Sequence, residues 1–167
     1  EQLLQKDIPL IRKVLNVDFK AVLVKGMGNY VCLRKLQDIS EEFWFLSKEE
    51  QEQIQKIEAW SRKTKDGSKS SLPIVPSFNA WEKVQAEGDA CNGSKCSHYE
   101  ECFFFKARKQ AANAQILVVN HHLLFADIAT RAENNDYSKP AILPPYNHLI
   151  LDEAHNIEDA ATEHFAF

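Results

Sequence analysis

Three of the four cysteines lie within one short stretch, at Cys91, Cys96 and Cys102, and the fourth, Cys32, comes about sixty residues earlier. Gly93 and the serines between the three let the backbone wrap around a small centre. Cysteine thiolates are ligands of zinc and of iron-sulfur clusters. The residue types therefore predict a metal centre, with Cys32 as the candidate fourth ligand.

The spacing and neighbours of the cysteines bear on three other interpretations. Inert core thiols fit poorly, because Lys95, His98, Glu100 and Glu101 are interleaved with them. Two disulfides would need an oxidising compartment, and no stretch has the pattern of a secretory leader. Structural zinc usually takes two closely spaced cysteine pairs, whereas a C-x4-C-x5-C trio with one remote thiol is more typical of a cubane iron-sulfur cluster. The spacing favours the cluster and leaves zinc as the alternative metal.

Two adjacent carboxylates, Asp152 and Glu153, follow the apolar residues 149–151. This is the arrangement of a Walker-B segment, in which the first acid holds the magnesium of a nucleoside triphosphate and the second orients the attacking water. The alternative is structural: Asp152 would cap the helix that follows, and Glu153 would favour its positive end. The full tetrapeptide Asp-Glu-Ala-His favours the nucleotide function.

The elements that must position these residues alternate between strands and helices. The apolar patterns predict strands at residues 21–24, 116–119 and 149–152, the last two buried. Cap and periodicity signals predict helices opened by Asp7, by the capping box Ser47 to Glu50, by Ser77, after Cys102, from Asn120 and from Glu153. Residues 63–71 and 133–139 are polar loops, the first expected to be mobile. This order predicts an α/β fold with ligands at the carboxyl ends of its strands.

Composition narrows the class of protein. Hydrophobic residues make up 44% of the chain, enough for a core, and the formal net charge of −4 argues against a surface that is positive throughout. No apolar run is long enough to span a bilayer, so we expect a soluble chain with no membrane partner.

Basic residues cluster at three places where DNA could still bind: 34–35, 62–65 and 106–109. Single-stranded nucleic acid binds surfaces that combine basic and aromatic side chains, although solvated helix faces explain such charges as well. The candidate DNA contacts are Arg34, Lys35, Tyr99, Lys106, Arg108 and Lys109. His121 and His122 open a helix without a partner at ligand spacing, and we interpret them as structural.

The motifs together resemble a known family. Asp152-Glu-Ala-His155 looks like the DEAH box, motif II, of superfamily-two helicases. The chain as a whole is similar to the DinG branch of the XPD-like iron-sulfur helicases, through the turn at residues 25–32, the cysteine trio followed by residues 106–108, and the segment at 118–124. The resemblance covers nearly the whole chain.

This resemblance implies part of a RecA-like parallel-sheet motor domain that carries a mostly helical iron-sulfur insert. The parts would be residues 1–30 and 107–167 of motor domain 1, with the insert at 31–106. Cys32, Cys91, Cys96 and Cys102 would hold a 4Fe-4S cluster. Asp152 would bind the magnesium of ATP, Glu153 would activate water, and His155 would couple nucleotide state to movement.

The resemblance also implies what kind of protein this chain would be part of. It would be a 5′-to-3′ ATP-dependent DNA helicase of DNA repair or replication, acting as a monomer on single-stranded DNA and duplex junctions in the bacterial cytoplasm, at the nucleoid. The rest of the helicase chain would be its partner.

Two departures from the family pattern affect what the chain can do. Met27 stands where an arginine is common, and no G-x-x-x-x-G-K-[ST] phosphate loop or later helicase motif is present. We therefore expect this chain alone not to hydrolyse ATP. Two alternatives stay open: a metal-stabilised module that binds single-stranded nucleic acid without ATPase activity, and a redox sensor.

Overall fold

The computed structural model describes residues 2–165, apart from the side chains of residues 40–42. The chain divides into two compact units: unit 1 comprises residues 2–25 and 110–165, and unit 2 comprises residues 26–109. For comparison, the sequence places the limits of the insert at residues 31 and 106. None of the described helices is both long enough and apolar enough to cross a membrane.

Unit 1 contains the parallel strands that the apolar runs predict. Strand β1 (Ala21–Leu23) pairs in parallel with β2 (Ile116–Val118), and Ala21 lies opposite Ile116. The backbone N–H of Val24 extends the pairing by donating a 2.9 Å hydrogen bond to the carbonyl oxygen of Val118. The prediction that the second run is covered on both faces is wrong at its start, because Ile116 is exposed.

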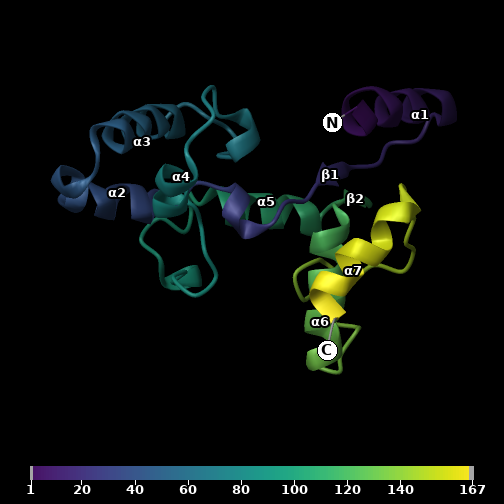
Figure 1. The fold of residues 1–167 in the computed structure, drawn as a ribbon. Coiled ribbons are helices and arrows are strands. Elements are labelled where there is room, and N and C mark those ends of the chain that lie inside the picture. The colour runs from purple at the N-terminus through teal and green to yellow at the C-terminus, as the bar shows by residue number, and fades with distance from the viewer. Residues whose placement is uncertain (1, 166–167) are drawn as a thin grey trace. The chain divides into compact units, whose positions relative to one another are not determined.

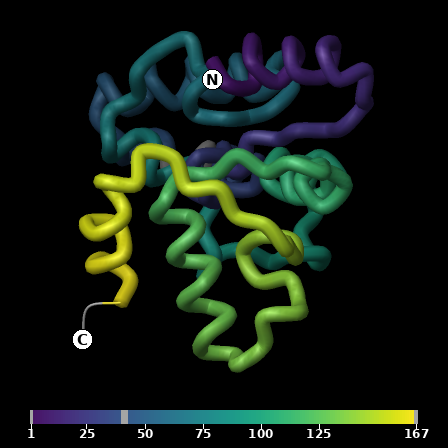
Figure 2. Tube along the Cα trace, turned by 90° about the vertical axis from the view of Figure 1, so that its right-hand side faces the viewer, coloured from purple at the N-terminus to yellow at the C-terminus, as the bar shows by residue number. Residues whose placement is uncertain are grey.

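Helices pack beside this small sheet within unit 1. Helix α6 (His121–Glu133) begins at Asn120, whose side chain accepts a 2.9 Å hydrogen bond from the backbone N–H of Leu123, as expected for an N-cap. It packs against α7 (Ile157–Phe165), as Figure 2 shows in green and yellow. Leu123 and Leu124 join Val24 in the buried cluster of this unit.

The start of unit 1 differs from its prediction. Helix α1 (Ile8–Leu15) follows directly on a π-helical turn, η1 (Leu3–Asp7). Asp7 therefore has helical dihedral angles and its side chain makes no capping hydrogen bond. The helical conformation extends through Asp7, so the predicted N-cap lies inside it. Pro9 is still in the first turn of α1, where its missing N–H is tolerated.

Unit 2 is built from helices around a buried cluster that includes Val31, Ile57, Trp81 and Val84. Figure 1 shows its helices α2 (Leu33–Glu42), α3 (Lys48–Ser61), α4 (Phe78–Val84) and the start of α5 (Phe103–Ala112). Short 3-10 turns connect them: η2 (Met27–Asn29), η3 (Phe43–Phe45), η4 (Lys69–Ser71) and η5 (Gly93–Lys95).

The predicted caps of unit 2 are confirmed. The side chain of Ser47 accepts a hydrogen bond from the backbone N–H of Glu50, and the Glu50 carboxylate accepts one from the backbone N–H of Ser47. Ser77 caps α4 in the same way, accepting from Ala80 at 3.3 Å. Both serines therefore satisfy backbone donors that helix geometry leaves unpaired.

The polar loop at residues 63–71 is tied down, although its composition predicts a mobile segment. The carboxylate of Asp66 accepts hydrogen bonds from the Thr64 hydroxyl, the Ser68 backbone N–H and the Ser71 hydroxyl. Gly67 is in the left-handed region, with φ of +59°, where a Cβ atom would lie 2.2 Å from the ring of Phe103. The small and polar residues here form a specific turn, so composition alone was misleading.

The third predicted strand, at residues 149–152, is not formed. These residues have no strand pairing, and Leu149, Ile150 and Leu151 are all exposed. A strand is stable when its backbone pairs with a neighbour, and the described part of the chain supplies a sheet of β1 and β2 alone. The expected helix from Glu153 begins later, with the 3-10 turn η6 (Ala154–Asn156) leading into α7.

Candidate metal centre

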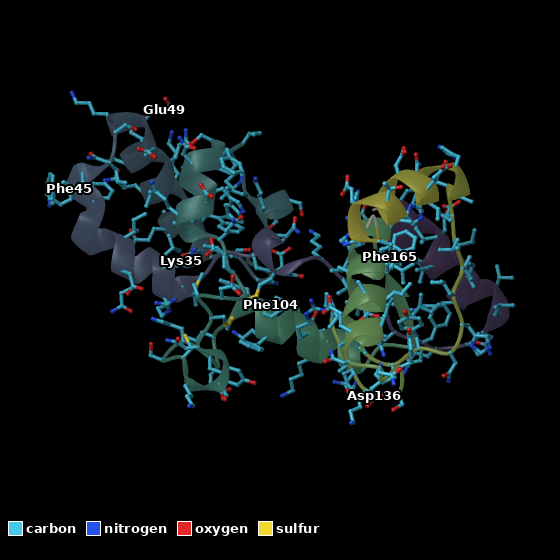
Figure 3. The ribbon with its side chains drawn as sticks, turned by 60° about the horizontal axis from the view of Figure 1, so that its bottom comes forward. Lys35, Phe45, Glu49, Phe104, Asp136 and Phe165 are labelled. Carbon is cyan, nitrogen blue, oxygen red and sulfur yellow. The ribbon has the colours of Figure 1, made fainter. Side chains whose placement is uncertain are left out.

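All four cysteines line one pocket within unit 2. Cys32 therefore lies near the trio, although about sixty residues of chain separate them. Met27, Ala86 and Phe105 form apolar parts of the wall. Figure 3 shows sulfur atoms in yellow near the labelled Lys35 and Phe104. Each cysteine is a free thiol and is half-buried.

Backbone pairing places Cys32 beside the second half of the insert. Val31 forms an antiparallel bridge with Gln85. The N–H of Cys32 donates a 2.7 Å hydrogen bond to the carbonyl oxygen of Val84, and the N–H of Ala86 donates one of 2.8 Å to that of Tyr30. This short ladder brings the distant cysteine to the segment that leads into Cys91.

Two of the thiols stand at the beginnings of helices. Cys32 directly precedes α2, and its carbonyl oxygen accepts a 3.0 Å hydrogen bond from the N–H of Leu36. Cys102 directly precedes α5 and accepts in the same way from Lys106, also at 3.0 Å. Both thiols therefore lie at the N-terminal ends of helices, where the backbone carries partial positive charge.

The pKa of Cys102 is nevertheless raised above its ordinary value. Burial is the main cause, and the nearby Cys32 and Cys91 thiolates also oppose a further negative charge, while the backbone N–H groups of Phe105 and Phe104 act in the other direction. The Sγ atom of Cys91 accepts a 3.4 Å hydrogen bond from the N–H of Gly93. The thiols are thus close enough to affect one another electrostatically.

Among residues 2–165, no group of three or more His, Cys, Asp or Glu side chains is arranged to hold a single metal ion. A shared pocket and the lack of single-ion geometry are compatible, because the thiolates around a cubane surround a body much larger than one ion. The donor set is four sulfurs, in a wall that mixes apolar residues with Arg34 and Lys35, and four cysteine sulfurs are a ligand set that fits an iron-sulfur cluster.

The predicted DNA contacts fall into two groups. Arg34 and Lys35 line the cysteine pocket and are engaged there: Arg34 bonds Asp38 and the carbonyl oxygen of Ala90, and Lys35 bonds Glu87. The others lie on or near α5, outside the set of pocket-lining residues. Arg34 and Lys35 thus differ from the other four candidates in lining the pocket, and DNA contact by all six stays a prediction.

Helix α5 presents cations over aromatic rings. The guanidinium of Arg108 lies 4.9 Å from the centre of the Phe104 ring, and the Lys106 ammonium lies 6.0 Å from that of Phe103. The ring of Tyr99 packs 4.8 Å from that of Phe105. These contacts hold charged and aromatic groups side by side, the combination found on single-strand-binding surfaces.

The acidic segment is exposed on unit 1. Asp152 accepts a 3.0 Å hydrogen bond from the backbone N–H of Glu153, and the Glu153 carboxylate lies 3.4 Å from Nδ1 of His155. Glu153 has a left-handed backbone with φ of +49° and makes no side-chain cap to η6. The structural alternative is wrong in its first part, because Glu153 and not Asp152 stands at the N-cap position. Glu153 directly precedes η6, and both carboxylates are exposed.

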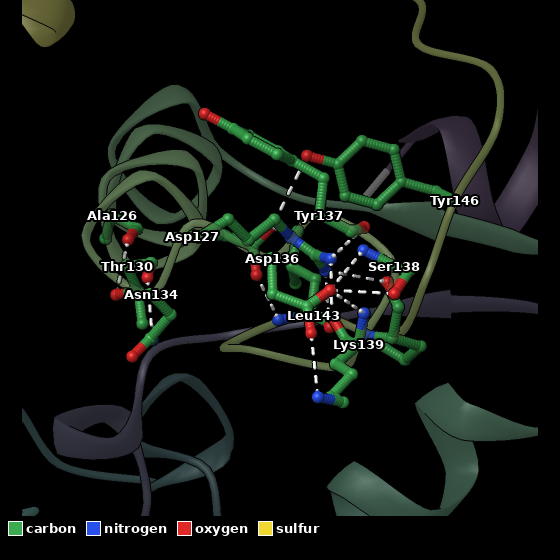
Figure 4. Close-up of polar contacts among 12 residues, drawn as sticks. Ala126, Asp127, Thr130, Asn134, Asp136, Tyr137, Ser138, Lys139, Leu143 and Tyr146 are labelled. Carbon is green, nitrogen blue, oxygen red and sulfur yellow. Dashed lines mark hydrogen bonds and ion pairs between the residues drawn. The ribbon is translucent and has the colours of Figure 1, made fainter.

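Sequence reasoning missed two sets of contacts in unit 1. His122 has a carboxylate neighbour, since its Nδ1 lies 3.1 Å from Glu163 of α7. A buried pair, Asp127 and Arg131, holds the loop that leads toward the acidic segment (Figure 4). The spacing of Asp127 and Arg131, four residues apart, was a signal, but on a helix it is equally typical of a surface ion pair.

The cysteine pocket and the acidic segment define a class of protein: a cysteine-rich helical unit in one chain with an α/β unit that carries a DEAH-type acidic segment. Residues 92–167 match the family model described as DEAD_2.

Three curated proteins are similar to nearly the whole chain. The chain is 33% identical to the "ATP-dependent DNA helicase YoaA" of Haemophilus influenzae over 99% of this chain and 25% of that protein. It is 33% identical to YoaA of Escherichia coli, over 99% of this chain and 26% of the relative. It is 29% identical to the "ATP-dependent DNA helicase DinG" of Escherichia coli, over 98% of this chain and 24% of the relative.

The resemblance to the DinG branch is thereby confirmed over nearly the whole chain. The chain spans about a quarter of the length of the curated relatives it matches.

Proposed function

We propose that this chain is the cluster-bearing portion of an ATP-dependent DNA helicase, with unit 1 forming part of a RecA-like motor domain. The observation that carries the proposal is the convergence of Cys32, Cys91, Cys96 and Cys102 on one pocket. Relatives that match nearly the whole chain are named ATP-dependent DNA helicases, which supports the same assignment.

The four cysteines would be the ligands of a 4Fe-4S cluster. When bound, such a cluster supplies a rigid four-point crosslink and one-electron redox chemistry. The chain's own residues do the positioning: the 30–32 ladder holds Cys32, the first turn of α5 holds Cys102, and the turn at Gly93 holds Cys91. Burial keeps water from part of the site, since all four thiols are half-buried.

The acidic segment would serve the nucleotide step in the parent protein. Asp152 would hold magnesium and Glu153 would orient water. His155, whose Nδ1 atom lies 3.4 Å from the Glu153 carboxylate, would couple the nucleotide state to motor movement. Both acids are exposed and free to meet groups supplied by the rest of the helicase. We expect this chain alone to show no ATP turnover; turnover abolished by Glu153→Gln would contradict this.

Single-stranded DNA would pass along α5. The pairing of Arg108 with Phe104 and of Lys106 with Phe103 supports this surface, because each cation sits over an aromatic ring. Arg108→Ala should weaken binding of an oligonucleotide. It should also reduce the slope of log affinity against log salt concentration by about one, the amount expected for one lost phosphate contact. Binding isotherms that stay unchanged over a salt series would remove Arg108 from the interface.

The decisive experiment is iron, sulfide and zinc analysis of anaerobically purified protein, with Cys32→Ser as the variant. About four iron and four sulfide per chain, lost in the variant, would fit the proposed cluster. One zinc per chain would instead favour the metal-stabilised single-strand-binding module. If Cys32→Ser keeps the full metal content, Cys32 is not a ligand and the proposed centre is wrong.

A further inference from the structure

The first turn of α2 reaches from the lone cysteine to the cysteine trio. Arg34 and Lys35 come directly after Cys32 and line the same pocket. The Nη2 atom of Arg34 donates a 2.6 Å hydrogen bond to the carbonyl oxygen of Ala90, the residue before Cys91. The Nζ atom of Lys35 lies 2.8 Å from the Oε1 atom of Glu87.

These contacts begin where the backbone ladder ends. The paired backbone joins residues 30–32 to residues 84–86 and goes no further. Residues 87–90 have no regular strand or helix, and a local 3.1 Å hydrogen bond from Cys91 N–H to Gly88 turns the chain. Arg34 and Lys35 therefore extend the connection from α2 across this turn to the residues just before Cys91.

We propose that Arg34 and Lys35 are positioning residues of the metal centre, rather than the DNA contacts that the sequence suggests. They hold the Cys91 loop against the helix that carries Cys32. This inference rests on the proposed function, because it needs a metal centre in the pocket.

Burial and geometry fit this role. The side chains of Arg34 and Lys35 are only 28% and 19% exposed, less than expected of phosphate-binding residues that reach into solvent. Arg34 bridges two partners: its Nη1 atom lies 3.0 Å from the Asp38 carboxylate, and its Nη2 atom donates to the carbonyl oxygen of Ala90. A lysine cannot reproduce this fork. The ion pair with Lys35 is strong enough to lower the pKa of Glu87 below its ordinary value.

The two cations act through their position rather than through net charge. Arg34 and Lys35 are each paired with a carboxylate, Asp38 and Glu87, and Glu87 lines the same pocket. Groups that orient the ligands of a metal centre from outside its ligand shell typically change metal affinity by about 10- to 100-fold when removed.

The test uses four variants of the whole chain. Three are the single changes Arg34→Lys, Lys35→Glu and Glu87→Lys, and the fourth is the double exchange that combines Lys35→Glu with Glu87→Lys. The protein is loaded with iron and sulfide anaerobically, and release to a chelator is followed by absorbance and by metal content. We expect each single change to speed release by about 10-fold or more. The double exchange should restore slow release, because it rebuilds the ion pair in reverse. Arg62→Ala, which breaks an exposed 2.6 Å pair with Glu58 outside the pocket, is the matched control.

Oligonucleotide binding by the same variants separates the two roles. Faster metal release in the single variants with rescue by the exchange would support the positioning role. Unchanged release would overturn it, as would weaker DNA binding at an unchanged release rate. If the unaltered chain takes up neither iron nor zinc, the proposed function fails as well, and that result is distinct from normal loading with insensitive variants.

Discussion

The guanidinium of Arg131 and the carboxylate of Asp127 meet at 2.7 Å in the interior of unit 1, where both side chains are buried. Each also bonds the loop that follows α6: Arg131 donates to the carbonyl oxygens of Tyr137, Lys139 and Leu143, and Asp127 accepts from the Leu143 N–H at 2.7 Å. Figure 4 shows this arrangement. The hydrogen bond to Asp127 raises the pKa of Arg131 above its ordinary value. The pair thus fixes the loop by which the chain approaches the acidic segment.

Breaking this pair should strongly destabilise the chain. Asp127→Ala leaves a buried guanidinium without its carboxylate, and we expect a loss of about 3–5 kcal/mol in the free energy of unfolding. Urea denaturation followed by circular dichroism measures this loss. Glu133→Ala is the control, because this carboxylate is exposed at the end of α6. Equal stability of Asp127→Ala and the unaltered chain would show that the pair does not hold the fold.

Two left-handed glycines should respond differently to the same substitution. Gly67 has φ of +59° and packs against Phe103, so Gly67→Ala adds both backbone strain and a collision with the residue next to Cys102. Gly93 has φ of +54° with open space around it, so Gly93→Ala adds strain alone. We expect about 1 kcal/mol for Gly93→Ala and about 2–5 kcal/mol for Gly67→Ala.

Thermal unfolding of the two glycine variants tests this difference. Metal content should also fall in Gly67→Ala, because a displaced Phe103 disturbs the helix start that holds Cys102. Similar losses of stability in the two variants would mean that the packing of Gly67 against Phe103 is unimportant.

Asp136 should remain ionised at lower pH than an ordinary aspartate does. A hydrogen bond from the Lys139 side chain, followed by the Ser138 hydroxyl and backbone N–H, lowers the pKa of Asp136 from 3.8 to about 2. Because this pKa is lower in the folded state, the resulting stabilisation is fully present above about pH 4 and is lost as the pH falls through about 2.

The carboxyl carbon shift of Asp136, followed by NMR over pH, gives the midpoint directly. Lys139→Ala should move that midpoint upward, toward the ordinary value. A midpoint near 3.8 in the unaltered chain would mean that the loop does not hold this carboxylate.

Two aliphatic residues of one loop should differ sharply in importance. Leu143 is 3% exposed and belongs to the buried cluster of unit 1, whereas Ile150 is 93% exposed. Leu143→Ala should cost about 2–5 kcal/mol of unfolding free energy, and Ile150→Ala should stay within about 0.5 kcal/mol. Chemical denaturation measures both. A large loss in Ile150→Ala would indicate that residues 149–151 do pack in this chain, as their apolar pattern first predicted.

Local signals in the sequence determined much of this protein. The capping box at Ser47, the caps at Ser77 and Asn120, and the strands near residues 21 and 116 depend on neighbouring residues, so short patterns suffice to predict them. The cysteine spacing also predicted a metal centre, which stays a prediction.

Tertiary structure decided what depends on distant partners. A strand needs a paired neighbour, so the apolar residues 149–151 could not reveal by themselves that they lie exposed. Charge alone could not show that Arg34 and Lys35 turn inward to Ala90 and Glu87, because those partners lie more than fifty residues away in the chain. In the same way, only the folded backbone brings Cys32 to the other three thiols.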